Sequence, residues 1–166
     1  MRLFIAVQFS KEVKELLLAA IADLKRQAVS GNFTRAENLH LTLAFIGESE
    51  NVAAIQRVID CCAVPAFELA VSGTGTFGNL FWAGIEKNPE LKALADTIQN
   101  SLRKSGFQIE ERAFKPHITL ARQLVTKGPV SINIRRTAMT VGRVSLMKSE
   151  RINGRLVYTE LYGKSL

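Results

Sequence analysis

One five-residue sequence occurs twice in this chain and contains both of its histidines. The two copies are HLTLA at residues 40–44 and HITLA at residues 117–121, identical at four of five positions. Their histidines lie 77 residues apart in a chain of 166, which is close to half its length. Because both histidines share the same context, coincidence explains the repeat poorly and an internal duplication explains it well. We therefore expect a fold with two related lobes.

Each copy has the residue pattern of a β-strand with one apolar face. Side chains alternate between the two faces along a strand, so the histidine, threonine and alanine of each copy are expected on one face. The leucine and isoleucine side chains point to the other face and pack inward against a helix. A pseudo-symmetric arrangement of the lobes would bring His40 and Thr42 together with His117 and Thr119 across one cleft.

The segments around the repeats predict an α+β fold. Ser10 has the position of an N-cap, and the apolar residues after it have helical spacing as far as residue 24. The same spacing predicts helices over 52–62 and 91–102, and Asn153-Gly154 is the clearest hairpin turn. The predicted strands are residues 3–9, 39–46, 67–71, 80–85, 118–121, 132–134, 138–147 and 156–161, with a turn-rich connection at 72–79.

The chain is expected to form one domain over residues 1–166, with two lobes and mainly antiparallel sheets. No linker rich in Pro, Gly or Ser divides it, and a chain of this length buries about 70% of its unfolded surface. The cysteines, Cys61 and Cys62, are adjacent and lack a second pair for a zinc site or a disulfide framework, which fits a reduced, cytoplasmic setting. The first apolar run, residues 3–7, is too short for a signal peptide or a membrane span.

The charge of the chain is concentrated in its second half. The formal net charge is +7, with 22 Lys and Arg against 15 Asp and Glu. Residues 1–83 carry a net charge of −1, whereas residues 84–166 carry +8. This asymmetry is compatible with a phosphate-bearing partner that binds the second half, although a well-solvated basic surface has the same composition.

The paired motifs contain the groups that phosphoryl transfer requires. Two imidazoles with ordinary pKa values near 6.5 suit a general acid and a general base at neutral pH. The hydroxyls of Thr42 and Thr119 can donate hydrogen bonds to phosphate oxygens. Lys115 and Arg122 flank the second motif and add cationic contacts, Arg122 in a bidentate way.

Two other interpretations of these residues are less favoured. A single histidine is usually a half-buried residue that is hydrogen-bonded in its sheet, but the duplication argues against this for the pair. A metal site would need more ligands than two histidines with no carboxylate in either motif, so we do not expect a metal. Residues 73–78 spell G-x-G-x-x-G, but this segment precedes a strand and opens no helix, so we interpret it as a flexible connection and not as a dinucleotide site.

The two motifs resemble the H-x-T-x pair of the 2H phosphoesterase superfamily, and their surroundings resemble the RNA 2′,3′-cyclic phosphodiesterases, historically called 2′-5′ RNA ligases. The likeness runs over essentially the whole chain. One departure is Gln8-Phe9-Ser10, where the family often has Leu-Pro after the first strand. The similar segments are RLFIA at 2–6, ENL at 37–39, FIGE at 45–48, FKP at 114–116 and AR at 121–122.

This resemblance implies a bilobal fold in which two antiparallel sheets line a central cleft with helices outside. It implies hydrolysis of a terminal 2′,3′-cyclic phosphate on RNA or on small cyclic nucleotides to a 2′-phosphate, without cofactor. His40 would be the proton donor to the leaving 3′ oxygen and His117 the acceptor from water, while Thr42 and Thr119 hold the phosphate. A 2′-5′ ligase that runs the chemistry in reverse, and a non-catalytic module that binds RNA or nucleotides, are the alternatives.

Phe45 and Trp82 are the aromatic candidates for stacking on a terminal base. Strict alternation places Phe45 on the face opposite His40, which favours core packing for this residue. The sequence leaves the role of Trp82 open.

Overall fold

Three α-helices and nine strands follow one another along the chain, and the computed structural model describes all residues, 1–166. Each α-helix begins at a polar side chain that accepts a hydrogen bond from the first turn. Ser10 Oγ accepts from Val13 N–H at 3.3 Å, and Asn51 and Asn88 cap the other two helices in the same way. The predicted N-cap at Ser10 is confirmed. The elements are β1 (Arg2–Val7), α1 (Lys11–Gln27), β2 (Ala28–Phe33), the 3₁₀ turn η1 (Ala36–Asn38), β3 (Leu41–Glu48), α2 (Val52–Asp60), β4 (Phe67–Phe77), β5 (Leu80–Ile85), α3 (Pro89–Lys104), β6 (His117–Thr126), β7 (Thr137–Val141), β8 (Arg143–Ile152) and β9 (Arg155–Ser165).

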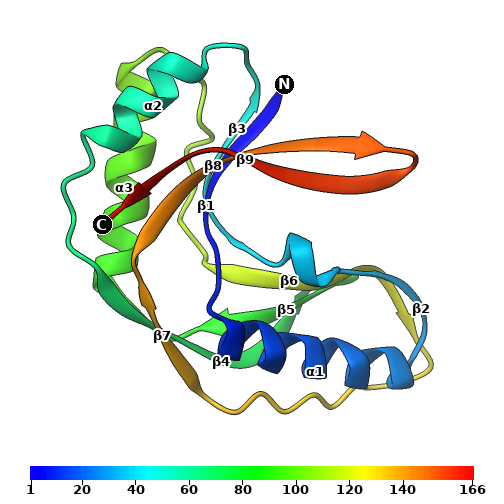
Figure 1. Ribbon diagram of the computed structural model, residues 1–166. Coiled ribbons are helices and arrows are strands. Elements are labelled where there is room, and N and C mark those ends of the chain that lie inside the picture. Colours follow the sequence, from blue (N-terminus) through cyan, green and yellow to red (C-terminus); the bar gives the residue numbers. More distant parts are fainter.

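The strands form two separate antiparallel sheets, as the α+β prediction required. One sheet has the order β3-β1-β8-β9 and the other the order β2-β6-β5-β4-β7, and β7 passes directly into β8 through Gly142. The α2 and α3 helices pack together on the outer side of the first sheet, and α1 packs against β2, β6 and β7 of the second (Figure 1). The β8–β9 hairpin extends beyond the first sheet (Figure 1). None of the helices is long and apolar enough to span a membrane.

The hydrophobic residues divide between a large core and a small cluster on the opposite face of the first sheet. The core contains 35 buried residues from both sheets and the helices. The small cluster consists of Phe4, Ala6 and Met147, with Tyr158 packed against it. Because Thr42 lies directly opposite Ala6 in the β1–β3 pair, this second face is the one that carries the first motif.

The two motif strands share one irregularity. Ala6 lies opposite Thr42 but Ile5 lies opposite Ala44, so β3 has one extra residue at position 43. In β6 the corresponding extra residue is at position 120, since Trp82 lies opposite Thr119 and Phe81 opposite Ala121. Each motif therefore contains a β-bulge at the same place. The duplication extends to this detail of the backbone.

The bulges correct the prediction that the motif alanines share a face with the histidines. Ala44 and Ala121 are buried in the core, whereas the residues that follow them turn to the face of the histidines. Phe45, which follows the first bulge, lies opposite Phe4 and is 50% exposed. The prediction that Phe45 packs in the core is wrong for this reason.

The predicted flexible connection at 72–79 is also wrong, because β4 continues to Phe77 and pairs with β5. Gly75 lies opposite Trp82, and a Cβ atom at Gly75 would lie 2.2 Å from the indole ring. Glycine is required there to make room for Trp82. The β2 strand was not predicted, and the predicted strand at residues 132–134 does not form. Residues 138–147 were predicted as one strand, but Gly142 divides them between β7 of the second sheet and β8 of the first. The hairpin at Asn153-Gly154 is confirmed, with φ values of 51° and 77°.

Candidate active site

His40 is held on three sides just before β3. Its Nδ1 atom lies 2.7 Å from the carbonyl oxygen of Asn38 and its Nε2 atom 3.0 Å from Thr42 Oγ1. A carbonyl oxygen only accepts, so Nδ1 carries a proton and, in the neutral ring, Nε2 is the basic nitrogen. The ring also packs against Phe4, with centroids 4.9 Å apart, and meets the edge of Tyr158 at 5.0 Å.

His117, at the start of β6, has closely similar surroundings. Its Nδ1 atom donates to the carbonyl oxygen of Lys115 at 2.8 Å, again two residues before the histidine. The ring of Phe77 stands edge-on to the imidazole at 5.1 Å, in the role that Tyr158 has for His40. Both histidines therefore have the same tautomer and direct Nε2 away from their own loop.

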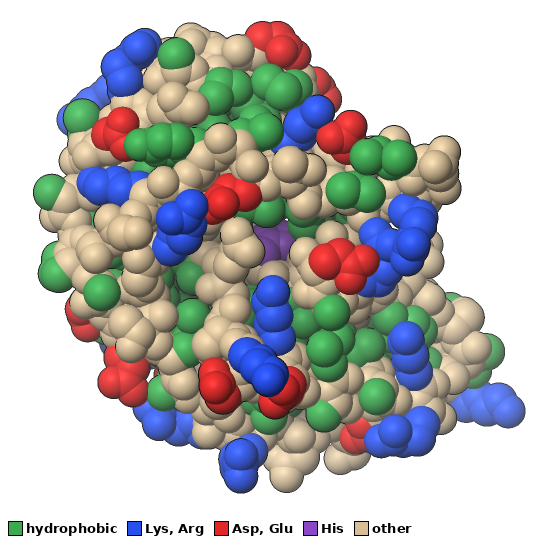
Figure 2. All heavy atoms as spheres, in the orientation of Figure 1, with side chains coloured by type: hydrophobic (Ala, Val, Ile, Leu, Met, Phe, Trp, Pro, Cys, Tyr) green, Lys and Arg blue, Asp and Glu red, His purple; other side chains and the backbone are tan.

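The two sheets bring the motif side chains into one cleft. The positive charges of Arg122 and His117 both lower the pKa of His40, which indicates that these side chains lie near it. Figure 2 shows histidine atoms at the bottom of a hollow near the centre of one face, with basic and acidic side chains around its rim. The predicted juxtaposition of the two histidines across a cleft is thus what the fold produces.

The other predicted residues lie at different distances from the histidines. Arg122 is equivalent in position to Phe45 in the other motif. Its positive charge lowers the pKa values of both His40 and Tyr158. Phe45 lies farther out, under the guanidinium of Arg2 at 5.0 Å. The Lys115 side chain is exposed, and its backbone carbonyl makes the contact with His117.

Trp82 forms part of the floor beside the second motif. It lies directly opposite Thr119 across the β5–β6 pair, and its ring packs on Gly75 and against Phe77 at 5.4 Å. No group of three or more His, Cys, Asp or Glu side chains is placed to hold a metal ion.

Comparisons with known proteins agree with this geometry. The sequence profile of the 2′-5′ RNA ligase superfamily matches residues 13–153. The chain belongs to this superfamily. An RNA 2′,3′-cyclic phosphodiesterase from Thermotoga maritima is 34% identical over 131 residues, which cover 74% of this chain and 70% of the relative. One from Escherichia coli is 32% identical over 168 residues, covering 96% of this chain and 93% of the relative.

Solved structures place the whole chain in the same superfamily fold. Escherichia coli LigT complexed with 3′-AMP superposes with a TM-score of 0.89 at 29% identity, over 99% of this chain and 97% of that one. TT0787 of Thermus thermophilus also has a TM-score of 0.89, at 27% identity. The resemblance to 2H phosphoesterases is confirmed, and with it the expectation that the chain is an enzyme.

The charges in the cleft of this 2H phosphoesterase favour an anion. Burial is the main cause that lowers the pKa of His40, and the charges of Arg122 and His117 lower it further, against the raising effect of the Asn38 carbonyl. Burial likewise raises the pKa of the Tyr158 phenol, while Arg122, Arg2 and Arg151 oppose that shift. The charged groups that shift the pKa values of His40 and Tyr158 are thus all cations, which favours an anion such as phosphate beside them.

Three residues of the site could not be predicted from the sequence. Tyr158 and Phe77 lie in hairpins that are distant in sequence from the histidines they contact. Their aromatic character is the only signal in the sequence. Asn38 contributes through its carbonyl oxygen, and its buried side chain also donates to the carbonyl of Leu156 at 3.0 Å, which ties the loop before His40 to β9. Backbone contacts of this kind leave no signal in a single sequence.

Proposed function

We propose that this enzyme hydrolyses a terminal 2′,3′-cyclic phosphate, on RNA or on a small cyclic nucleotide, to a 2′-phosphate by acid–base catalysis with two histidines. The observation that carries the proposal is the matched pair of imidazoles, each with Nδ1–H fixed on a carbonyl oxygen and Nε2 available for proton transfer. The names of the relatives and the 3′-AMP in the LigT structure support a nucleotide substrate.

In the proposed reaction a water oxygen attacks phosphorus and the bond from phosphorus to O3′ breaks. His117 Nε2 accepts the proton that the water loses, and charged His40 donates its Nε2 proton to O3′. One water molecule is consumed and a 3′-hydroxyl and a 2′-phosphate are formed, after which the two imidazoles exchange their protons with solvent. A positioned acid or base contributes about 10²–10⁴-fold to such a step.

The remaining motif residues are proposed to hold the phosphate. The hydroxyls of Thr42 and Thr119 donate to the non-bridging oxygens, and the Arg122 guanidinium opposes the negative charge that builds up on them. Lys115 adds a more mobile charge at the rim. The contact between Thr42 and His40 at 3.0 Å keeps the proposed donor and the phosphate contact in register.

Phe45 and Trp82 are proposed as contacts for the nucleotide outside the phosphate. Trp82 lies beside Thr119, and Phe45 is half exposed on the face of the histidines with Arg2 above its ring. An exposed aromatic ring with an adjoining cation suits a base of single-stranded RNA.

The test is incubation with an oligonucleotide that ends in a 2′,3′-cyclic phosphate, with identification of the product isomer. We expect a 2′-phosphate, and we expect His40→Ala and His117→Ala each to lower kcat by at least about 100-fold while the chain stays folded. Near-normal turnover by either variant, or a 3′-phosphate product, would show that the proposed mechanism is wrong. A 2′-5′ ligase activity through the reverse chemistry would use the same residues and would appear as a joined product when an RNA with a 5′-hydroxyl is added.

A further inference from the structure

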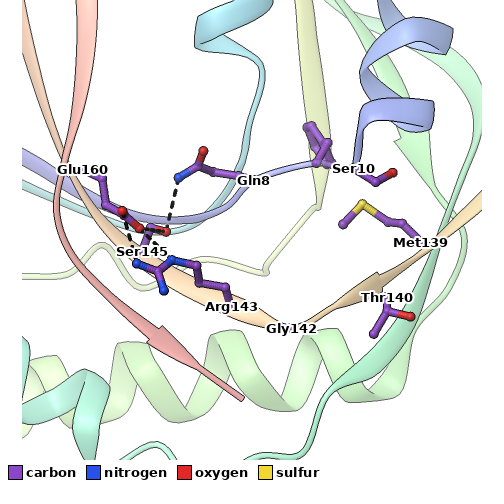
Figure 3. Close-up of a pocket in the computed structure, with 9 residues that line it drawn as sticks. Gln8, Ser10, Met139, Thr140, Gly142, Arg143, Ser145 and Glu160 are labelled. Atoms are coloured by element: carbon purple, nitrogen blue, oxygen red, sulfur yellow. Dashed lines mark hydrogen bonds and ion pairs between the residues drawn. The ribbon is translucent and has the colours of Figure 1, made fainter.

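The relative placement of the two motifs depends on what joins the first sheet to the second. The β7 strand passes directly into β8 through Gly142, but a polar cavity of about 420 Å³ lies beside this connection. Met139 of β7 lies on one side of the cavity, and Arg143 and Ser145 of β8 lie on the other (Figure 3). This connection leaves space between the sheets and does not by itself fix the distance between the two histidines.

The segment of residues 34–38, which leads from β2 of the second sheet to β3 of the first, is hydrogen-bonded to both sheets (Figure 1). At its start, Thr34 donates twice to β6. Its backbone N–H donates to the carbonyl oxygen of Leu120 at 2.9 Å, and its Oγ1 donates to that of Thr119 at 2.8 Å. Because Leu120 is the extra residue of the bulge, Thr34 binds the second motif at the point where its strand departs from regular pairing.

The other end of the segment holds the imidazole of the first motif. The carbonyl oxygen of Asn38 accepts the Nδ1 proton of His40 at 2.7 Å. The side chain of Asn38, in a residue that is only 7% exposed, donates to the carbonyl oxygen of Leu156 in β9 at 3.0 Å. Arg35 donates to the same carbonyl oxygen. This end is therefore anchored to the first sheet through two donors.

The part of the segment between these two anchors is short and internally bonded. Three residues, 35–37, separate Thr34 from Asn38, and the 3₁₀ turn η1 closes them with an i→i+3 bond from Asn38 N–H to the carbonyl oxygen of Arg35 at 2.9 Å. Arg35 also pairs with Glu37 at 3.4 Å. A displacement at one anchor is therefore transmitted to the other.

We infer that residues 34–38 form a positioning bridge between the two motifs, in which Thr34 holds the bulge of the second motif and Asn38 holds the imidazole of the first. The inference rests on the proposed function, because it concerns the relative placement of the two histidines that act in that reaction. Thr34 and Asn38 are positioning residues, since neither is proposed to touch the substrate. A misplacement of reacting groups by about 1 Å can lower a rate by about 100-fold, so such a bridge has a measurable effect on turnover.

The experiment measures kcat, KM and Tm with a nucleoside 2′,3′-cyclic phosphate as substrate. Thr34→Val removes the hydroxyl and keeps the shape of the side chain, whereas Thr34→Ser keeps the hydroxyl. Asn38→Ala removes the amide that ties the segment to β9. The Thr34 pair decides the question alone if Asn38→Ala lowers Tm below the assay temperature.

Two control variants each lose one hydrogen bond of the same kind outside the two motifs. Thr137→Val removes a bond from a threonine hydroxyl to the carbonyl oxygen of Arg135 at 3.0 Å. Gln27→Ala removes a bond from a side-chain amide to the carbonyl oxygen of Ser131 at 2.8 Å. Both controls should keep the kcat of the unaltered enzyme.

We expect Thr34→Val and Asn38→Ala each to lower kcat by about 10- to 100-fold, with KM changed less than about threefold, because the reacting groups are displaced from one another. Thr34→Ser should keep most of the kcat of the unaltered enzyme. The double variant Thr34→Val with Asn38→Ala should lose less than the product of the two single losses, because both residues act through one segment.

The pH dependence separates a positioning role from a general loss of stability. Burial is the main cause that lowers the pKa of His40, and the hydrogen bond to the Asn38 carbonyl opposes this shift. Loosening that carbonyl in Asn38→Ala should therefore move the alkaline limb of kcat/KM to lower pH, whereas Thr34→Val should leave this limb in place. The other titratable groups that face His40 are unchanged in these variants, namely His117 and Arg122 of β6 and Tyr158 of β9.

A kcat for Thr34→Val and Asn38→Ala equal to that of the controls would overturn the inference, as would a Thr34→Ser variant as slow as Thr34→Val. Either result would still show turnover of cyclic phosphates. Failure of the proposed function is distinguishable, because the unaltered enzyme would then turn over no cyclic phosphate.

Discussion

The replacement Gly75→Ala should destabilise the protein through Trp82. A Cβ atom at position 75 would lie 2.2, 2.4 and 2.8 Å from three carbon atoms of the indole ring, far inside van der Waals contact. The ring cannot simply turn aside, since it packs against Phe77. Forcing one extra carbon into a packed site costs about 1–3 kcal/mol. For a chain of this size each kcal/mol lowers Tm by about 2–4 °C, so we expect a fall of about 2–12 °C.

The matched control is Gly128→Ala, because a Cβ atom there would meet nothing within 4 Å and the backbone needs no positive φ. Replacement of a glycine by alanine at such a position usually stabilises by about 0.4–1 kcal/mol, since it restricts the unfolded chain. The two variants should therefore shift Tm in opposite directions. A second comparison uses the Trp82→Leu variant alone and combined with Gly75→Ala. Gly75→Ala should destabilise the protein much less when the large ring is absent.

Thermal unfolding, measured by circular dichroism, tests this reasoning on the unaltered protein, the three single variants and the double variant of Gly75 and Trp82. Turnover of a cyclic phosphate should also fall in Gly75→Ala, because Trp82 lies opposite Thr119 and its displacement moves the floor of the cleft. If Gly75→Ala is as stable as the control, or if its cost persists in the Trp82→Leu background, the glycine is not there to make room for the indole.

Three further predictions concern the cleft. Treatment with a strong chelator should leave turnover unchanged, because hydroxyls and basic side chains are proposed to hold the phosphate. Activity that is lost and returns only with added divalent metal would contradict this. Both kcat and kcat/KM should have a bell-shaped pH dependence, and the alkaline limb, assigned to His40, should lie at lower pH in kcat/KM than in kcat. The variant His40→Ala should lose the alkaline limb and His117→Ala the acid limb. The opposite pattern would exchange the two proposed roles. The free energy of unfolding should decrease as the pH falls below 6.5, since the lowered pKa of His40 means that the unfolded chain binds more protons there. His40→Gln should remove part of that decrease in denaturant titrations at pH 7.5 and 5.5, and an unchanged decrease would exclude His40 as its source.

The sequence predicted the face of the histidines and threonines because both precede the bulge in their strand. Period-two alternation held for His40 and Thr42 and failed at Ala44 and Phe45. The extra residue shows only when β3 is matched with β1, and nothing within the motif marks it. Alternation is a reliable guide only as far as the first irregularity in strand pairing.

Residues whose role depends on a partner distant in the chain could not be predicted from the sequence. The glycine-rich part of β4 has the composition of a turn, and its true constraint is the size of Trp82 on the neighbouring strand. The β2 strand has no fully buried residue, and it is held by pairing with β6 and by contacts such as the hydrogen bond from Asn32 to Gln123 at 2.8 Å. Such strands have no apolar face and give no periodic signal.

The duplication supplies two equivalent backbones, but the proposed reaction needs two histidines in opposite protonation states. The surroundings of His40 oppose the charged form that the proposed donor needs. His40 lies against Phe4 and Tyr158 on a partly buried face and is opposed by the charge of Arg122, so its neutral form is favoured in the empty cleft. The proposed donor must be charged, and a phosphate anion of the substrate, at its proposed place between His40 and Arg122, would offset this cost. Binding and protonation of His40 should therefore reinforce each other. This coupling is the physical reason for expecting the alkaline limb to move to higher pH once substrate is bound.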